Sequence, residues 1–271
     1  MQTTDETSSA STSEEMLYHE VSGAGPVALL VPGTPGDAGQ FAALSAALGD
    51  YYTVISYDRR GTSRSPRPAG WSTTSVAEQA DDAAAILARV TSEPALVYGT
   101  SNGAAVALEL ALRHPERVSG VLVHEMPLLT VLADPEPVGQ MLGELIGAGM
   151  ERGGPTAALD AFLRFAYGDE IVDQLAPDLR DRMYANAEMI FTIEMPAFQA
   201  YRPDEAGLRS LDVPVRVLVG EDQAVPLFAE AASWLAERIG TVVVASPGAH
   251  GPHLSHPTEL AAFTATLDPA R

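Results

Sequence analysis

Short apolar runs that alternate with helical stretches constrain the fold of this chain most. The runs are continuous and rich in Val, Leu and Ile. Such runs are typical of strands that are buried on both faces, because helices cover both sides of a parallel sheet. The sequence therefore predicts an α/β fold with a mostly parallel sheet and helices on both faces. The expected strands are Leu17–Val21, Val27–Val31, Tyr52–Tyr57, Ala95–Tyr98, Val118–His124, Val215–Val219 and Thr241–Ala245, with helices at Phe41–Leu48 and Ser75–Val90.

The strand pattern stops between two of these runs, and helical stretches replace it. A helical cap at residues 126–209 is therefore expected, inserted in a core of residues 16–125 and 210–271. The insertion is rich in Met, Phe and Tyr; most of these pack its own core, and some are expected to form an adaptable apolar pocket wall. The helical stretches are Pro137–Arg152, Thr156–Leu175 and Asp178–Ala200.

Composition excludes several classes of function. The chain has 271 residues, 36 acidic against 16 basic, and a net charge of −20, so neither nucleic acid nor an anionic membrane is an expected partner. Every basic residue is arginine and there is no cysteine, which excludes a Schiff-base lysine, a disulfide framework and a thiol nucleophile. Residues 1–15 are polar and acidic and are expected to be a disordered tail rather than a signal peptide. A cytoplasmic protein, either a monomer or a homodimer, is expected.

Ser101 is the candidate nucleophile. It stands in Gly99-Thr100-Ser101-Asn102-Gly103, between an apolar strand and a helical stretch that begins at Ala104. This is G-x-S-x-G in a strand–turn–helix context, where small flanking residues let the strand and the helix pass closely and the hydroxyl points away from the sheet. A plain glycine-rich turn would satisfy the five-residue pattern alone, but the flanking elements favour a catalytic serine.

A serine nucleophile needs a base and an acid that orients it. The loop after the last expected strand supplies the base candidate His250, with His253 and His256 as competitors. Asp222 and Glu125 both follow expected strands, at the edge of the sheet where ligands bind. We expect Asp222 to be the acid and keep Glu125 as the alternative.

An oxyanion hole needs two hydrogen-bond donors. The backbone N–H of Asn102 follows the candidate nucleophile and lies at a helix N-terminus, where partial positive charge gathers. The loop Pro32-Gly33-Thr34-Pro35-Gly36 follows another expected strand. Pro35 has no N–H, so Thr34 is the expected second donor.

The chain resembles the α/β-hydrolase fold superfamily over about residues 17–267. Gly99–Gly103 matches the nucleophile turn of the family, and Tyr57–Ser65 resembles its motif D-x-R-G-x-G-x-S, with Ser63 in place of a glycine. Pro32–Gly36 resembles H-G-x-P-G, with Pro32 in place of histidine. Ala249–Pro257 resembles G-H-x-x-x-x-E-x-P, with Ala249 in place of glycine and Ser255 in place of the acid. The last match selects His250 among its neighbours. The spacing around Asp222 is one residue short of the pattern, which keeps Glu125 open.

The resemblance implies hydrolysis of an ester, thioester or amide of a small, mostly apolar molecule through an acyl-enzyme. Neither a metal nor an organic cofactor is implied, and the expected partner is a small-molecule substrate. Two alternatives stay open. The same fold hosts C–C bond hydrolases, acyltransferases and cyclases of secondary metabolism, and it also hosts non-catalytic ligand-binding proteins.

Overall fold

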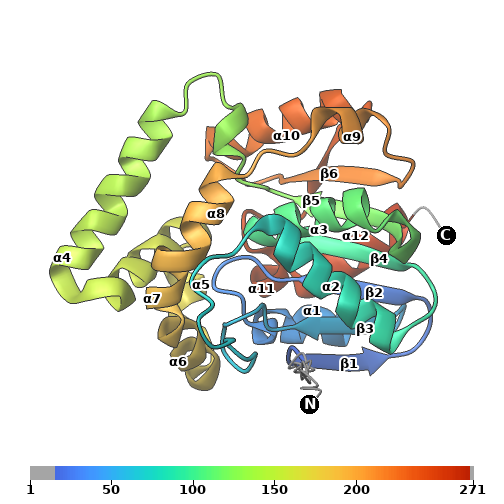
Figure 1. The fold of residues 1–271 in the computed structure, drawn as a ribbon, viewed down its shortest axis with the longest axis horizontal. Helices are drawn as coiled ribbons and strands as arrows, with labels where there is room; N and C mark the ends of the chain where they lie inside the picture. Colours follow the sequence, from blue (N-terminus) through green and yellow to red (C-terminus); the bar gives the residue numbers. More distant parts are fainter. Residues whose placement is uncertain (1–15, 269–271) are drawn as a thin grey trace, which may run out of the picture.

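The computed structural model describes residues 16–268, which build a sheet of seven strands between two layers of helices (Figure 1). The first strand runs antiparallel to its neighbour, and all other neighbouring strands are parallel. This confirms the expected fold class. The predicted tail, residues 1–15, lies outside the described residues. The strands, in their spatial order, are β1 (His19–Gly23), β3 (Thr53–Tyr57), β2 (Val27–Val31), β4 (Ala95–Thr100), β5 (Val118–His124), β6 (Val215–Gly220) and β7 (Val243–Ser246).

The central strands lie where the apolar runs predict them, whereas the two edge strands begin two residues late. β2 and β5 have the expected bounds, but β1 begins at His19 rather than Leu17, and β7 at Val243 rather than Thr241. Most residues of the edge strands are exposed or half-buried. An apolar run is a weak guide to such a strand, because burial is what selects apolar residues.

Helices cover both faces of the sheet (Figure 1). α2 (Val76–Val90), α3 (Asn102–Arg113) and α10 (Pro226–Ile239) pack in one hydrophobic cluster, and α1 (Ala42–Leu48) and α12 (Pro257–Leu267) pack in the cluster on the other face. Short helical segments connect these elements. They are η1 (Ala38–Phe41), η2 (Pro115–Arg117), η3 (Leu129–Val131) and α11 (Pro252–Ser255).

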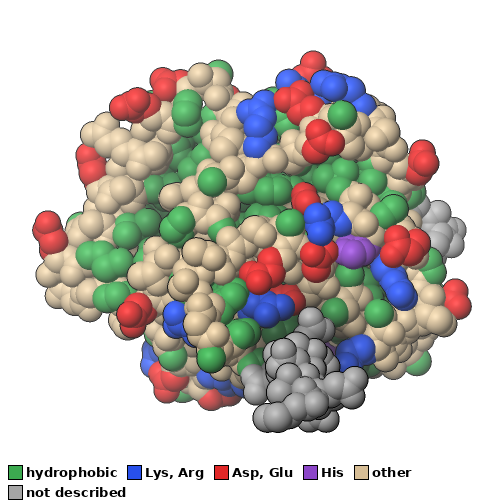
Figure 2. Space-filling view, viewed as in Figure 1, with side chains coloured by type: hydrophobic (Ala, Val, Ile, Leu, Met, Phe, Trp, Pro, Cys, Tyr) green, Lys and Arg blue, Asp and Glu red, His purple; other side chains and the backbone are tan. Residues whose placement is uncertain are grey.

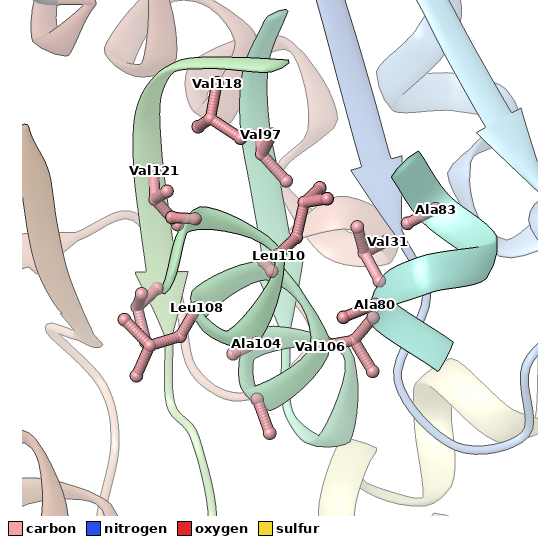
Figure 3. Close-up of a cluster of buried hydrophobic side chains, with 14 of the residues drawn as sticks. Val31, Ala80, Ala83, Val97, Ala104, Val106, Leu108, Leu110, Val118 and Val121 are labelled. Carbon is pink, nitrogen blue, oxygen red and sulfur yellow. The ribbon is translucent and has the colours of Figure 1, made fainter. Parts of the chain in front are cut away.

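α3 is the most deeply buried helix of the core, and it carries the residues that follow Ser101. Figure 3 shows it lying against β4 and β5 on one side and α2 on the other. Its small and branched side chains, among them Ala104, Val106 and Leu110, are fully buried. Packing on both sides fixes the start of α3 rigidly above the end of β4, since interiors are as dense as organic crystals.

Residues 126–209, which we call the cap, contain helices and no strand. The first helix is interrupted at Gly154, whose φ is +74°, between the first two helical stretches that the sequence predicts. A π-helical turn, Ile190–Glu194, interrupts the third stretch. The elements are α4 (Glu136–Tyr167), α5 (Asp169–Asp173), α6 (Pro177–Ala185), α7 (Ala187–Met189), η4 (Ile190–Glu194), α8 (Met195–Ala200) and α9 (Glu205–Arg209).

Buried polar contacts hold the cap against the core. Arg59 and Glu194 form an ion pair at 2.7 Å in which both side chains are 1% exposed. Asn186 accepts a hydrogen bond from the backbone of Ser63 and donates one to its hydroxyl. Ser63 has a φ of +47°, which glycine adopts without strain. It stands at the position where the motif D-x-R-G-x-G-x-S has its second glycine.

Charged side chains are spread over the outer surface. Figure 2 shows acidic groups across the visible face, with arginines mostly beside them. Within residues 16–268, no helix has the length and hydropathy that are needed to cross a membrane.

Candidate active site

Ser101 lies on a sharp turn between β4 and α3. Its φ of +53° and ψ of −130° are strained values for a residue with a side chain. A Cβ at Gly99 would lie 2.4 Å from the Gly103 carbonyl oxygen, and a Cβ at Gly103 would lie 2.3 Å from that of Val31. Glycine is therefore required at both flanks because the strand and helix backbones approach too closely for any side chain.

His250, in the loop after β7, is paired with Glu125. The His250 Nδ1 atom lies 2.7 Å from the Glu125 Oε2 atom, and both side chains are buried. Glu125 directly follows β5, next to β4 in the sheet, and its φ of +46° turns it out of the strand direction. The carboxylate also accepts hydrogen bonds from the Gly220 N–H and the Gln223 amide. These contacts hold it in one orientation toward the imidazole.

Asp222, the expected acid, lies elsewhere. Its side chain is exposed in the turn after β6, while its backbone N–H donates to Gly248. The physical reason is that the N–H groups of Glu221 and Asp222 donate to the carbonyls of Ser246 and Gly248, which holds this stretch in the turn with the Asp222 side chain in solvent. Gln223 instead reaches Glu125 from this loop. The geometry thus favours Glu125, the alternative, over Asp222.

The electrostatics of the pair suit an ionised acid. Burial acts to raise the pKa of Glu125, but the hydrogen bond from His250 and the nearby imidazoles outweigh it and hold that pKa below its usual range. Glu125 is therefore a carboxylate at neutral pH. An anion that accepts from Nδ1–H fixes the imidazole tautomer and leaves the lone pair on Nε2, where a base would take up a proton.

The other histidines near this edge are already engaged. His253 is buried with Nε2 3.1 Å from the Gln40 amide oxygen, and burial lowers its pKa well below the usual value. His256 contacts Ser255, and His124 contacts the hydroxyl of Thr100. Burial lowers the pKa of His124 to about 4, so it is neutral at pH 7. Among these, His250 alone meets a carboxylate.

Thr34 and Asn102, the expected oxyanion donors, lie together. The Asn102 side-chain amide donates to the Thr34 hydroxyl at 3.0 Å. Within residues 16–268, the backbone N–H of neither residue donates a hydrogen bond to protein, whereas the N–H of Ser101 donates to His124. Two free backbone N–H groups beside a candidate nucleophile are what an oxyanion hole requires.

A small cavity of about 60 Å³ lies between the candidate catalytic residues and the cap. Ser101, Asn102 and His250 line it. The other lining residues come from the cap and from α10, and all but one glutamine are apolar. These lining residues are Pro127, Leu129, Leu142, Phe162, Phe165, Ala166, Met195, Phe198, Gln199, Leu227 and Phe228.

A larger groove, about 680 Å³, lies elsewhere between α2, α3 and the end of the cap. None of the candidate catalytic residues lines it, and its charged groups are already engaged. Arg113 and Arg202 are paired with Asp81 and Glu205, Glu109 accepts a hydrogen bond from Tyr201, and Asp204 accepts from the backbone at the start of α9. The chemistry, rather than the size, therefore identifies the smaller cavity as the candidate site. Within residues 16–268, no group of three or more His, Asp or Glu side chains could hold a metal ion.

Sequence reasoning missed two contributors to this site. Phe228 lies with its ring 4.5 Å from that of His250 and nearly parallel to it, and Gln223 donates to Glu125. Both residues follow β6, which lies next to β5 in the sheet. Their place in the sequence could have suggested them, because neighbouring parallel strands end at the same edge of the sheet. Among the Met and aromatic residues of the cap, Phe162, Phe165, Met195 and Phe198 do line the cavity.

Comparisons with known proteins agree with this architecture. A model of the "Alpha/beta hydrolase family" matches residues 28–263. The "Uncharacterized hydrolase YraK" of Bacillus subtilis is 32% identical over 238 residues, which cover 86% of this chain and 85% of the relative. A thermophilic esterase from Thermogutta terrifontis has a TM-score of 0.71 at 23% identity, covering 92% of each chain. An enol-lactonase from Burkholderia xenovorans has a TM-score of 0.70 at 20% identity, covering 93% of this chain and 94% of the other.

The two solved structures share the fold of this chain, and at such low sequence identity the likeness shows the fold alone. The family match and the Bacillus relative span most of the chain, as the sequence motifs predict. Together with the strand–turn–helix at Ser101, they identify this chain as an enzyme that belongs to the α/β hydrolase family.

Proposed function

We propose that this hydrolase cleaves the ester bond of a small, uncharged and mostly apolar molecule through an acyl-enzyme. The observation that carries the proposal is that His250, paired with the buried carboxylate of Glu125, lines the same cavity as Ser101. Ser101 is the nucleophile, His250 the general base and acid, and Glu125 the residue that orients the imidazole. This replaces Asp222 in the role that the sequence suggests for it.

The arrangement supports a two-step reaction. Ser101 Oγ attacks the carbonyl carbon while His250 Nε2 takes its proton, and the oxyanion accepts hydrogen bonds from the N–H groups of Thr34 and Asn102. The alcohol leaves with the proton from His250. Water then attacks the acyl-enzyme, again giving a proton to His250, and the acid departs as the proton returns to Ser101.

The cavity walls support an uncharged substrate. None of the lining residues is Lys, Arg, Asp or Glu. An anionic or cationic group in the cavity would therefore lose its hydration with no opposite charge to replace it. The small volume of the cavity favours a short chain or a flat ring in it.

Labelling with a fluorophosphonate probe, followed by a panel of neutral p-nitrophenyl esters and a neutral lactone, tests the proposal. The wild-type protein should be labelled and should turn over the short esters, whereas Ser101→Ala should lose both by several orders of magnitude and keep its melting temperature. Equal labelling of the two proteins would refute Ser101 as the nucleophile. Labelling without ester or lactone turnover would favour the acyltransferase alternative.

A further inference from the structure

Tyr167 connects the cap to the catalytic residues. It is the last residue of α4, and Gly168, with a φ of +87°, ends the helix directly behind it. The ring is buried and lies 5.9 Å from the ring of His250, at an angle of 27°. A Cβ at position 251 would lie 2.9 Å from the Tyr167 ring, so Gly251 lets the ring reach the backbone beside His250.

The hydroxyl of Tyr167 reaches the other half of the site. It donates a hydrogen bond of 3.2 Å to the backbone carbonyl of Thr34. Burial raises the pKa of Tyr167 far above neutrality, so the hydroxyl remains protonated and able to donate. A single cap residue thus contacts both the general base and the loop that carries an oxyanion donor.

The same loop is held at neighbouring points. The Asn186 amide, also in the cap, donates to the Pro35 carbonyl at 3.1 Å. From the core, the Asn102 amide donates to the Thr34 hydroxyl. The two consecutive carbonyls are therefore held by the cap, and the side chain of Thr34 is held by the core.

We propose that Tyr167 is a positioning residue, through which the cap completes the oxyanion hole. The inference rests on the proposed function. An oxyanion donor is effective only when its N–H lies close to the position that the charge will occupy, and misplacement by about 1 Å costs about a hundredfold in rate. The Tyr167 hydrogen bond holds the Thr34–Pro35 peptide. This peptide is joined at the Thr34 Cα to the peptide that carries the Thr34 N–H, so fixing the first limits how far the N–H can move from that position. The cap then serves the reaction itself as well as forming the pocket wall.

Tyr167→Phe tests the proposal, because it removes the hydroxyl and keeps the ring packed on His250. Tyr184→Phe is the matched control: Tyr184 lies in the same cap, its hydroxyl donates to Asp160, and it does not line the cavity. We expect Tyr167→Phe to lower kcat for a short neutral ester by about fivefold to twentyfold. The KM and the pH midpoint of activity should stay within twofold and about 0.3 units of the wild type, because neither the apolar walls nor the Glu125–His250 pair changes.

Both half-reactions should slow, since each passes through an oxyanion. Acylation is measured as the rate constant of the burst of p-nitrophenol from a p-nitrophenyl ester, and deacylation as the steady rate after the burst. The proposal is overturned if Tyr167→Phe keeps wild-type kcat, if Tyr184→Phe loses as much, or if the loss appears as a shifted pH midpoint, which would place the hydroxyl's effect on His250. The two proposals are tested separately. Loss of wild-type turnover in Ser101→Ala tests the proposed function, and the ratio of kcat in Tyr167→Phe to kcat in the wild type tests the role of Tyr167.

Discussion

Glu125 and His250 are 125 residues apart in the sequence, and their side chains meet at 2.7 Å beneath the cap. The carboxylate extends from the end of β5, which pairs with β4, the strand that leads to Ser101. The Ser101 N–H donates to the carbonyl of His124, the residue before Glu125. The proposed nucleophile and the proposed acid are therefore tied to each other through one backbone hydrogen bond, which holds their spacing.

Glu125→Gln and Asp222→Asn should differ sharply in activity. Glutamine keeps the shape of Glu125 but carries no charge to stabilise the imidazolium, so we expect kcat to fall by about 10³- to 10⁴-fold. Asp222 is exposed and lies apart from His250, so Asp222→Asn should stay within about twofold of the wild type. Ester kinetics on both variants, with melting curves, measure this. A larger loss in Asp222→Asn would return the acid role to that residue.

Met195→Gln should alter substrate choice, whereas Phe191→Asn should not. Both side chains pack against the cap's hydrophobic cluster, but only Met195 also lines the cavity. Adding an amide to an apolar wall should reduce kcat/KM for a bulky apolar ester about tenfold more than for an acetate ester. The ratio of the two substrates is the measurement. A similar change of ratio in Phe191→Asn would show that selectivity arises from general loosening of the cap.

Glu194→Gln should destabilise the protein strongly. It leaves the buried Arg59 guanidinium without its carboxylate, and removing one partner of a buried pair costs about 3 kcal/mol or more in the free energy of unfolding. Replacing both residues with methionine should restore most of that loss. The exposed pair of Arg209 and Glu205 provides the control, since Arg209→Gln should change stability by less than about 0.5 kcal/mol. Urea unfolding at pH 7 measures the free energy of unfolding of all three variants. A double methionine variant that is less stable than Glu194→Gln would contradict the expectation.

Buried His124 should make the fold sensitive to acid. Its pKa is about 4 in the folded protein because burial disfavours the charged form, against an ordinary value of about 6.5 in an unfolded chain. Between those values the unfolded state binds the proton and the folded state does not, so stability falls as the pH falls from 6.5 to 4 and then levels off. His124→Asn should reduce that loss by about 3 kcal/mol. Unfolding free energies measured from pH 7 to pH 4 test this, and parallel curves for the two proteins would count against it.

The sharp turn that carries Ser101, the proposed nucleophile, could be predicted because its signal is local. The glycines around Ser101 are needed by backbones within a few residues of it and by β2 alongside, so strand, turn and helix are readable in one continuous stretch. The parallel sheet was predictable for a similar reason: a strand buried on both faces must be apolar along its length. The edge strand β1 is exposed for most of its length and carries no such apolar run, so the prediction began it two residues too early.

The sequence alone thus determined the α/β architecture, the turn that carries Ser101 and the loop that carries His250. It left two acids open, since Glu125 and Asp222 both follow strands that end at the same edge. Only the tertiary structure decided which of them meets His250: Glu125 does, whereas the turn after Gly220 directs Asp222 to solvent and Gln223 to Glu125. The role of Tyr167 was likewise hidden, because a hydrogen bond to a carbonyl 133 residues away depends on how the cap docks and leaves no periodic pattern in the sequence.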